Sequence, residues 1–391
     1  MNFDNTEQAY RIKTNQELYR ALYLFRLISN NTLVSIGSKL AILAIKLKFP
    51  ITVFFKHTVF KHFCAGHEKE DSLMLVERLK KLNVRSYMHF AAEGQKSEMG
   101  MNLSLAKTLE TISFSKNTEA LPFAVFKATG LGAFSLFEKK SNGIALNDTE
   151  EAAWIRVLNR IYKCCERAKE LNVRMLIDAE ESWVQDAIDK IAHELMETYN
   201  QEHTIIYTTI QMYRKDRLAY LKKLLKTAEQ KKFTVGVKLV RGAYIEKENK
   251  RAQELGIPSP ICENKEATDV NFNAALDYIL PRVDQCNLFL GSHSEASVLK
   301  VVQWMKDNKI PNEHPTIWFS QLYGMADQIS FNLAAVGYQV VKYVPYGPVK
   351  EVIPYLIRRA QENTSVGGQT PRELKLIKKE LKRRKLKAVQ D

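Results

Sequence analysis

A barrel of eight parallel strands, each followed by a helix, is the fold class that the sequence predicts, and three observations lead to it. Eight short runs, most of them rich in Val, Ile, Leu, Phe or Tyr, follow one another from residue 85, as expected for strands buried on both faces. Charged segments with helical periodicity separate these runs, which favours an alternation of strands and helices. No Gly-x-Gly-x-x-Gly follows any run, which disfavours an open dinucleotide-binding sheet.

The predicted elements divide the chain into three parts. The eight predicted strands cover residues 85–91, 123–128, 174–179, 204–211, 234–240, 288–291, 316–320 and 339–344. Helical periodicity is clearest at 216–231 and 295–308. We expect an N-terminal helical region over 1–84, the barrel over 85–370 and a basic C-terminal tail over 371–391, which is predicted to form a helix. A helical excursion at 129–173, which ends in a helix over 150–171, separates strands two and three.

The composition is that of an ordinary globular protein. The 391 residues are 45% hydrophobic and 26% charged, which excludes a disordered or collagen-like chain. Five cysteines, at positions 64, 164, 165, 262 and 286, show no metal-ligand spacing. Their odd number argues against a disulfide framework or a zinc site and favours a reducing compartment.

The positive charge is unevenly distributed. The net charge is +14, and residues 372–387 hold nine Lys or Arg against two Glu, which is half of that excess. The rest of the chain is only mildly basic, so a general nucleic-acid-binding role is disfavoured. The stretch at 33–63 is apolar but interrupted by lysines and Pro50, so we expect no membrane-spanning helix. It is predicted either to cap a core or to rest on a bilayer surface, and the first residues do not resemble a secretion signal.

Polar or ionisable side chains stand at the ends of seven of the eight predicted strands. In chain order they are Lys127; Asp178, Glu180 and Glu181; Gln211; Lys238 with Arg241, Gly242, Ala243 and Tyr244; Ser292 and His293; Gln321 and Leu322; and Tyr343. The carboxyl ends of barrel strands meet at one mouth, where active sites are built. A structural role could explain any one of these side chains, but seven strand ends together favour an active site.

The helix expected after strand eight carries a second signal. Tyr355, Arg358, Arg359 and Glu362 have the spacing that places them on one helical face. Glu362 lies three and four residues beyond the two arginines and can orient both guanidinium groups. Two oriented guanidinium groups form a bidentate clamp for a carboxylate, which lysines could not match.

Residues 85–365 resemble proline dehydrogenase, the flavoenzyme family of proline catabolism, in its monofunctional, mitochondrial-like form. The matching motifs are Lys127 at the end of strand two, IDAEE, TIQMY, KLVRGAY, the stretch with Lys265, Thr268, Asp269, Asn271 and Phe272, GSHSE, QLYGM, YVPYG and YLIRRAQENTS. Nine motifs in order, each at its expected place, make this resemblance specific.

The resemblance implies a role for each matching residue and no metal. Asp178 and Lys238 match the catalytic pair. The positions that match FAD-binding residues are Gln211, Arg241, Gly242, Ala243, Tyr244, Ser292, His293 and Glu362. The positions that match the proline site are Lys127, Leu322, Tyr343, Tyr355, Arg358 and Arg359. One departure is that the bacterial bifunctional branch has Arg in place of Lys238 and Lys in place of Arg241.

The resemblance also implies the reaction and its partners. It implies oxidation of L-proline to 1-pyrroline-5-carboxylate, with hydride passing to flavin N5 and electrons to a membrane quinone. We therefore expect a cytoplasmic protein in peripheral contact with the inner face of the respiratory membrane, with no nucleic-acid partner. Two other classes stay open from the residues alone: a barrel lyase that uses Lys127 or Lys238 as a Schiff-base nucleophile, and a nucleic-acid-binding protein that uses the basic tail.

Overall fold

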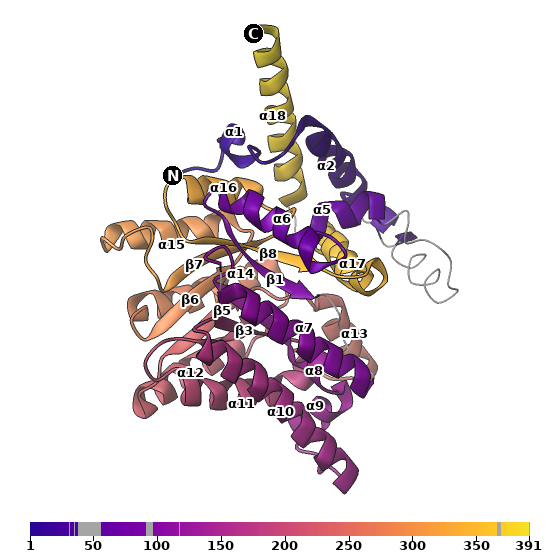
Figure 1. Ribbon diagram of the computed structural model, residues 1–391, viewed down its shortest axis with the longest axis vertical. Helices are drawn as coiled ribbons and strands as arrows, with labels where there is room; N and C mark the ends of the chain where they lie inside the picture. Colours follow the sequence, from indigo (N-terminus) through magenta and orange to yellow (C-terminus); the bar gives the residue numbers. More distant parts are fainter. Residues whose placement is uncertain are drawn as a thin grey trace. The chain divides into compact units, whose positions relative to one another are not determined.

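The computed structural model describes residues 1–30, 32–34, 36–37, 56–90, 97–116, 118–365 and 369–390. The chain divides into two compact units, one made of Met1–Ser86 with Gln321–Asp391 and the other of Tyr87–Ser320. Figure 1 shows the elements with the labels used below. Most of the apolar stretch predicted at 33–63 lies outside the described residues, so its two interpretations stay predictions.

Eight parallel strands form one sheet in the order β1-β8-β7-β6-β5-β4-β3-β2, which confirms the (βα)8 barrel. The strands are β1 Arg85–Phe90, β2 Phe123–Lys127, β3 Arg174–Asp178, β4 Ile206–Gln211, β5 Val235–Val240, β6 Cys286–Gly291, β7 Ile317–Leu322 and β8 Val340–Tyr346. All eight predicted strands are present, with ends that differ by at most two residues. The register places Lys127 of β2 beside Asp178 of β3, and Lys238 of β5 beside Thr209 of β4, the strand between β3 and β5.

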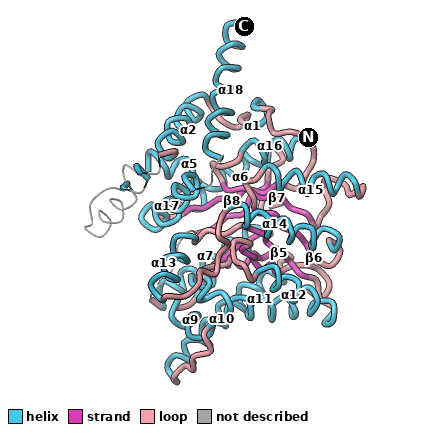
Figure 2. Tube along the Cα trace, turned by 180° about the vertical axis from the view of Figure 1, so that it is seen from behind, coloured by secondary structure: helices cyan, strands magenta, loops and turns pink. Residues whose placement is uncertain are grey.

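Helices follow the strands as the alternation predicts. They are α1 Thr6–Ala9, α2 Asn15–Ile28, the π-helical turn Lys56–Phe60, α5 Lys61–Phe63, α6 Lys69–Lys80, α7 Glu98–Lys116, α8 Ala128–Leu131, α9 Phe134–Ser141, α10 Asp148–Glu170, α11 Ser182–Tyr199, α12 Arg217–Lys231, α13 Ile245–Leu255, α14 Lys265–Ile279, the 3-10 turn Leu280–Arg282, α15 Glu295–Asp307, α16 Asp327–Ala335, α17 Val349–Ser365 and α18 Gln369–Gln390. In the unit Tyr87–Ser320, α11, α12, α14 and α15 lie outside the strands (Figure 2). The expected excursion between strands two and three consists of α8, α9 and α10.

Aromatic side chains fill the inside of the sheet in the unit Tyr87–Ser320. The ring of Phe123 on β2 lies 5.6 Å from that of Tyr207, 5.0 Å from that of Phe289 and 5.1 Å from that of Trp318, all in edge-to-face geometry. The guanidinium group of Arg174 lies over the rings of Phe123 and Trp318. These large side chains pack the interior at the start of the strands, which leaves the carboxyl ends for polar groups.

The basic segment predicted as a tail is helix α18, which packs against the first helices of its own unit. Leu376, Ile377 and Leu381 are buried on this helix. The guanidinium group of Arg384 donates hydrogen bonds to the backbone oxygens of Tyr10 and Lys13, at 2.9 and 2.8 Å. The segment is therefore a folded part of the protein, because one face of the helix supplies core residues and bonded arginines.

A buried ionic cluster joins separate segments of the same unit. Asp327 at the start of α16 binds Lys13 at 2.9 Å and Lys342 of β8 at 2.8 Å. Burial alone would raise the pKa of Asp327, but the two lysines outweigh it and hold that pKa far below its usual value. Glu373 of α18 accepts a hydrogen bond from the backbone N–H of Ala326, which has a left-handed conformation with φ +50°. The loop after β7 is thus fixed by charged groups from three distant segments.

Candidate active site

Three charged side chains come together at the carboxyl ends of β2, β3 and β5. The ammonium group of Lys238 donates a 2.6 Å hydrogen bond to Oδ1 of Asp178, and the side chains of both residues are largely buried. Lys127 Nζ lies 3.8 Å from Oδ2 of the same carboxylate and donates a 3.2 Å hydrogen bond to the hydroxyl of Tyr244. The sequence predicted these three residues at strand ends, and the structure brings them into one ionic group.

The charges in this group stabilise one another. Burial would raise the pKa of Asp178, but Lys238, Lys127 and His89 outweigh it and lower that pKa. Burial would lower the pKa of Lys238, but Asp178 outweighs it and raises that pKa. Asp178 is therefore a carboxylate and Lys238 an ammonium at neutral pH. A carboxylate with a lowered pKa and two lysine neighbours is a poor proton acceptor, so Asp178 orients the lysines.

Aromatic rings surround the ammonium of Lys238. Its nitrogen lies 5.3 Å from the ring centre of Tyr87 and 5.8 Å from that of Phe289, within the range of cation–π attraction. Burial raises the pKa of the Tyr87 hydroxyl despite the nearby lysine. The cation is thus held at a fixed position between one carboxylate and two ring faces.

Arg241, at the loop after β5, is held on every side by residues of the following elements. Its guanidinium group donates to Asp269 at 2.7 Å, to the hydroxyl of Ser292 at 2.9 Å and to that of Ser297 at 3.0 Å. The same group stacks on the ring of Phe272, 4.3 Å from the ring centre. Two residues of the Lys265–Phe272 motif therefore orient this arginine, a structural role that the resemblance did not specify.

Gly242 is required by the geometry of the same loop. Its φ of +134° is rarely adopted by residues with a side chain, and an added Cβ would lie 2.4 Å from the ring of Tyr213. Asn271 of α14 supports the facing loop by donating hydrogen bonds to the backbone oxygens of Met212 and Arg214. Ala243 next to it is exposed. The glycine therefore lets the backbone of this loop pack directly against the ring of Tyr213.

The donors at these strand ends fit the chemistry of a flavin nucleotide. Lys238, Arg241 and Ser292 carry N–H and O–H groups that suit ring carbonyls and phosphate oxygens, while the amide of Gln211 at the end of β4 donates to the backbone oxygen of Glu180. The buried hydroxyl of Thr209, one row below Gln211 on β4, has no hydrogen-bond partner among the described residues. His293 follows β6 and is half-buried. The residues present are consistent with FAD.

The remaining predicted residues form a second group, within the unit of Met1–Ser86 and Gln321–Asp391. The rings of Tyr343 on β8 and Tyr355 on α17 lie 5.9 Å apart, and the guanidinium of Arg359 lies 5.2 Å from the ring centre of Tyr355. Arg358 is half-buried on the same helix, and Leu322 ends β7. Tyr343 lies three residues before the end of β8, since the strand continues to Tyr346. Glu362 falls in α17, but its side chain is outside the described part of the structure.

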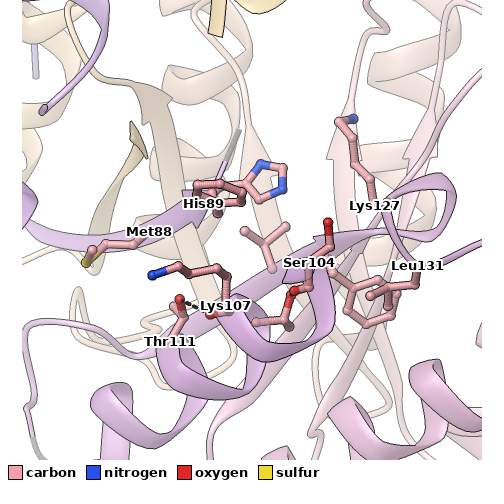
Figure 3. Close-up of a pocket in the computed structure, with 12 residues that line it drawn as sticks. Met88, His89, Ser104, Lys107, Thr111, Lys127 and Leu131 are labelled. Carbon is pink, nitrogen blue, oxygen red and sulfur yellow. Dashed lines mark hydrogen bonds between the residues drawn. The ribbon is translucent and has the colours of Figure 1, made fainter. Parts of the chain in front are cut away.

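A small cavity lies beside the ionic group, lined by the ends of β1 and β2 and by α7. His89, Ser104, Lys107 and Lys127 are among its lining residues (Figure 3). The hydroxyl of Ser104 is buried with no hydrogen-bond partner in the described chain. The sequence did not point to the first three residues, because no polar residue ends the strand predicted at 85–91.

The sequence also did not single out Glu180 and Thr129 as a pair. Glu180 belongs to the IDAEE motif two residues after Asp178, and it is 4% exposed. It accepts a 3.0 Å hydrogen bond from the backbone N–H of Thr129, which lies two residues after Lys127. The position of Glu180, two residues after Asp178, could have pointed to it. The sequence does not show, however, that its partner is Thr129 after another strand.

The fold and the group of ionised side chains at its strand ends define a barrel enzyme. Among the described residues, no cluster has the makeup of a metal site and no helix is both long and apolar enough to cross a bilayer. The family model of proline dehydrogenase matches residues 73–372. The chain belongs to the proline dehydrogenase family.

Individual relatives align with most of the chain. The chain is 31% identical to mitochondrial proline dehydrogenase 1 of Dictyostelium discoideum, over 97% of this chain and 74% of the relative. It is 31% identical to hydroxyproline dehydrogenase of Xenopus laevis, over 96% and 88%. It is 33% identical to the carbapenem antibiotics biosynthesis protein CarD of Pectobacterium carotovorum subsp. carotovorum, over 82% and 83%.

Solved structures share the fold at lower identity. Proline utilization A (PutA) from Bdellovibrio bacteriovorus, inactivated by N-propargylglycine, superposes with a TM-score of 0.70 at 20% identity. The match covers 92% of this chain and 38% of that protein, so the chain spans about two fifths of its length. At this identity the likeness establishes the barrel fold alone.

Proposed function

We propose that this protein oxidises L-proline to 1-pyrroline-5-carboxylate with FAD as its cofactor, the first step of proline catabolism. Family membership supports proline oxidation. The observation that carries the fuller proposal is the ionic group of Lys238, Asp178 and Lys127, which places two ammonium groups and one carboxylate at the strand ends of a packed barrel.

Residues at the ends of β4, β5 and β6 are proposed to hold FAD. Gln211, Arg241 and Ser292 supply polar groups, Gly242 and Ala243 allow close approach of the backbone, and Tyr244, His293 and Glu362 complete the set. When bound, FAD supplies the hydride acceptor, its N5 atom. The protein's part is to place the donor carbon within van der Waals distance of that atom and to fix the surrounding charge.

Proline is proposed to bind through its carboxylate to Arg358 and Arg359. Planar guanidinium groups bind a carboxylate with two parallel hydrogen bonds, and Lys127 adds a third positive charge. Tyr343 and Leu322 would cover the pyrrolidine ring, and Tyr355 supports Arg359 through the ring contact at 5.2 Å. These contacts hold the substrate by its unreactive end.

The charge near the reacting carbon favours the reaction. Hydride leaves only from the neutral amine, because the nitrogen lone pair stabilises the developing iminium. The ammonium groups of Lys127 and Lys238 disfavour a further positive charge on the substrate nitrogen, so they promote loss of its proton to water. The same cations stabilise negative charge that develops on the oxidant. Lys238 acts here as a fixed cation, held by Asp178.

The same geometry argues against the two competing classes. A Schiff-base lysine must be a neutral amine, and the raised pKa of Lys238 and its 2.6 Å bond to Asp178 keep it charged. Nucleic-acid binding through the basic segment is disfavoured because Arg383 and Arg384, two of its arginines, both donate hydrogen bonds to Glu380 of the same helix. A flavin-dependent oxidation is therefore the better interpretation.

An anaerobic titration tests the proposed function. Purified protein should be yellow with flavin absorbance, and L-proline should bleach that absorbance in the absence of oxygen. A soluble quinone should then restore the oxidised spectrum, since we propose quinone as the electron acceptor. A colourless protein that borohydride cross-links to a carbonyl substrate would support the lyase instead. A proline-reduced flavin that quinone does not reoxidise would remove the acceptor assignment alone.

We also propose peripheral attachment to an anionic membrane through one face of α18. Lys375, Lys378, Lys382 and Lys385 are exposed and spaced by three and four residues, so they form one stripe along the helix. The stripe lies away from the buried face that contains Leu376 and Ile377. Each lysine contributes about 1 kcal/mol at most near an anionic bilayer, and salt weakens it, so four permit reversible attachment.

Liposome sedimentation tests this attachment. Removing the helix would expose buried residues, so the informative variant changes all four lysines of the stripe to glutamine in the full chain. We expect it to lose binding to anionic vesicles at low salt, while the matched four-arginine variant retains it. Neutral vesicles serve as the control for charge. Equal sedimentation of the wild-type protein and the glutamine variant would exclude this stripe as the attachment surface.

A further inference from the structure

The end of β2 carries a helix start that its own residues cannot satisfy. Helix α8 begins at Ala128, so Lys127 occupies the N-cap position. An N-cap residue usually accepts a hydrogen bond from a free N–H of the first turn, which the side chain of lysine cannot do. Lys127 instead extends toward Asp178 and Tyr244. The first turn of α8 therefore needs an acceptor from elsewhere in the chain.

Glu180 provides that acceptor from the loop after β3. One oxygen of its carboxylate accepts the backbone N–H of Thr129 at 3.0 Å, and the other accepts the hydroxyl of the same residue. Glu180 is 4% exposed and Thr129 is 2% exposed. Both oxygens of one buried carboxylate are thus committed to the residue that lies two positions after Lys127.

Glu180 is itself held in place by the neighbouring elements. Its backbone N–H donates to the side-chain oxygen of Gln185 at 2.8 Å, and its backbone oxygen accepts from the amide of Gln211 at 2.7 Å. Gln185 donates in turn to Asp189, which forms an ion pair with Arg217. This chain of buried hydrogen bonds runs from α12 through α11 to the end of β2, so the carboxylate has little freedom to move.

We infer that Glu180 is a positioning residue. By holding Thr129, it fixes Lys127 in the position from which Lys127 contacts the substrate carboxylate. The inference rests on the proposed function, because it concerns how proline binds. Glu180 touches neither Asp178 nor Lys238 in any hydrogen bond or ion pair that the structure gives, so its effect passes through the start of α8. Its loss should weaken proline binding more than it slows hydride transfer.

The protonation state of Glu180 gives this role a pH signature. Burial raises the pKa of its carboxyl to about 7, against the opposing effects of Lys127 and Thr129. The other charged groups nearby are Glu181 on the same loop, Asp189 behind Gln185 and, on α13, Lys247 and Glu248, which bind Glu181 and Ser182. Below pH 7 the carboxyl of Glu180 becomes neutral. It then loses one of its two acceptor positions and part of its attraction for Lys127, so the KM for proline should rise.

A set of matched variants tests the inference in the FAD-loaded full chain. Glu180→Gln keeps the size but removes the second acceptor, and Thr129→Val removes the hydroxyl donor. We expect each to raise proline KM roughly tenfold, with kcat changed less than KM, because a charge-assisted hydrogen bond is lost. Thr129→Ser should restore near-native KM. Glu181→Gln, a neighbouring buried carboxylate paired with Lys247, is the control and should leave KM unchanged.

Two further measurements separate positioning from general damage. The double variant Glu180→Gln with Thr129→Val should be no worse than either single variant, since both break the same contact. In wild-type protein, log KM for proline should change with pH around a midpoint near pH 7, and this change should be absent in Glu180→Gln. Additive effects, or an unchanged pH profile, would overturn the inference. If Glu180→Gln does not fold, the Thr129→Val and Thr129→Ser pair still decides it.

Different results would contradict the proposed function and the positioning role of Glu180. If wild-type protein shows no reduction of its flavin by proline, the proposed function is wrong. If wild-type protein oxidises proline and both the Glu180→Gln and Thr129→Val variants keep native KM, only the positioning role is wrong.

Discussion

Arg358 and Arg359 offer a direct test at the scale of single residues. We expect Arg358→Lys and Arg359→Lys each to weaken proline binding while FAD stays bound, because lysine keeps the charge but lacks the planar pair of donors. The loss of one charged hydrogen bond should cost about 1.5–3 kcal/mol, which is roughly ten- to hundredfold in affinity. Titration of flavin reduction with proline measures it. Near-native affinity in both variants would remove these arginines from the substrate site.

Tyr343 is the residue at which substrate choice is tested. If its ring covers the pyrrolidine ring, Tyr343→Ser should make room for a ring hydroxyl and accept 4-hydroxyproline better. Affinity for proline should fall by about 1–3 kcal/mol, the scale of a lost apolar contact in a pocket. Unchanged discrimination would place Tyr343 outside the pocket.

His62 should make the folded protein sensitive to acid. Burial lowers the pKa of its imidazole to about 3, and Nε2 bonds to the backbone oxygen of Gly324 at 2.8 Å. Because the folded pKa is below the unfolded value near 6.5, the stabilisation is complete above pH 6.5. It is lost as the pH falls toward 3, by at most about 1.4 kcal/mol per pH unit.

Urea unfolding between pH 7 and pH 4 measures this sensitivity. Wild-type protein should lose more stability over this interval than His62→Gln, whose amide can donate to the same oxygen but does not titrate. The carboxyls of Glu180 and Glu373, with pKa values raised by burial to about 7, act in the opposite direction in both proteins. The difference between the two proteins therefore isolates His62, and parallel curves would contradict the prediction.

The residues of the site were only partly predictable. The strand-end pattern placed Lys127, Asp178 and Lys238 at one mouth, and the structure joins them through one hydrogen bond and one ion pair. Glu180 and Thr129 were missed as a pair because their contact joins residues 51 positions apart. A pattern along the chain reveals periodicity, but it does not reveal which buried acceptor meets which backbone N–H on another strand.

At the scale of elements, strands buried on both faces were the most predictable feature. Every residue of β4 and β8 is buried, so each appears in the sequence as a continuous run. The predicted end of β8 is two residues short, because Pro345 lacks the N–H that strands usually donate. Its oxygen nevertheless accepts a 3.1 Å hydrogen bond from the N–H of Ala65, and the strand continues to Tyr346.

The partners of α18 could not be read from the sequence. The count of basic residues predicted a charged tail, whereas the structure divides those residues between two faces. Arg372 pairs with Asp4 at 2.8 Å and Arg384 binds backbone oxygens near α1, while the lysines of the stripe point away. Charge patterns reveal an excess of one sign, but not which charges are neutralised by segments hundreds of residues away.

The buried cluster around Asp327 gives a prediction about how elements are held together. In Asp327→Asn, the ammonium groups of Lys13 and Lys342 lose their shared counterion in a buried place. We expect a loss of about 3–5 kcal/mol in the free energy of unfolding, measured by urea denaturation. Asp277→Asn, which breaks the exposed pair with Lys300, should cost less than about 1 kcal/mol. Similar losses in both variants would show that the buried cluster contributes no more to stability than an exposed ion pair.

At the scale of the whole molecule, the five cysteines provide a simple measure of folding. All five are free thiols, and only Cys262 is not buried. Burial raises the pKa of Cys164 and that of Cys286 to about 12, which suppresses the reactive thiolate. A thiol reagent at pH 8 should therefore modify one thiol of the native protein within minutes and all five after denaturation. Rapid reaction of two or more native thiols would contradict the described packing.

The unit of Met1–Ser86 and Gln321–Asp391 has a consequence for the timing of biosynthesis. Its two segments are separated by the whole of Tyr87–Ser320, so α1 and α2 leave the ribosome long before α18, their packing partner, exists. At about 5–20 residues per second over the interval from Ile28 to Gln369, the delay is roughly 20–70 s. During that interval the apolar faces of the first helices lack the cover that α18 gives them. They are therefore the part of the nascent chain that a chaperone would be expected to bind.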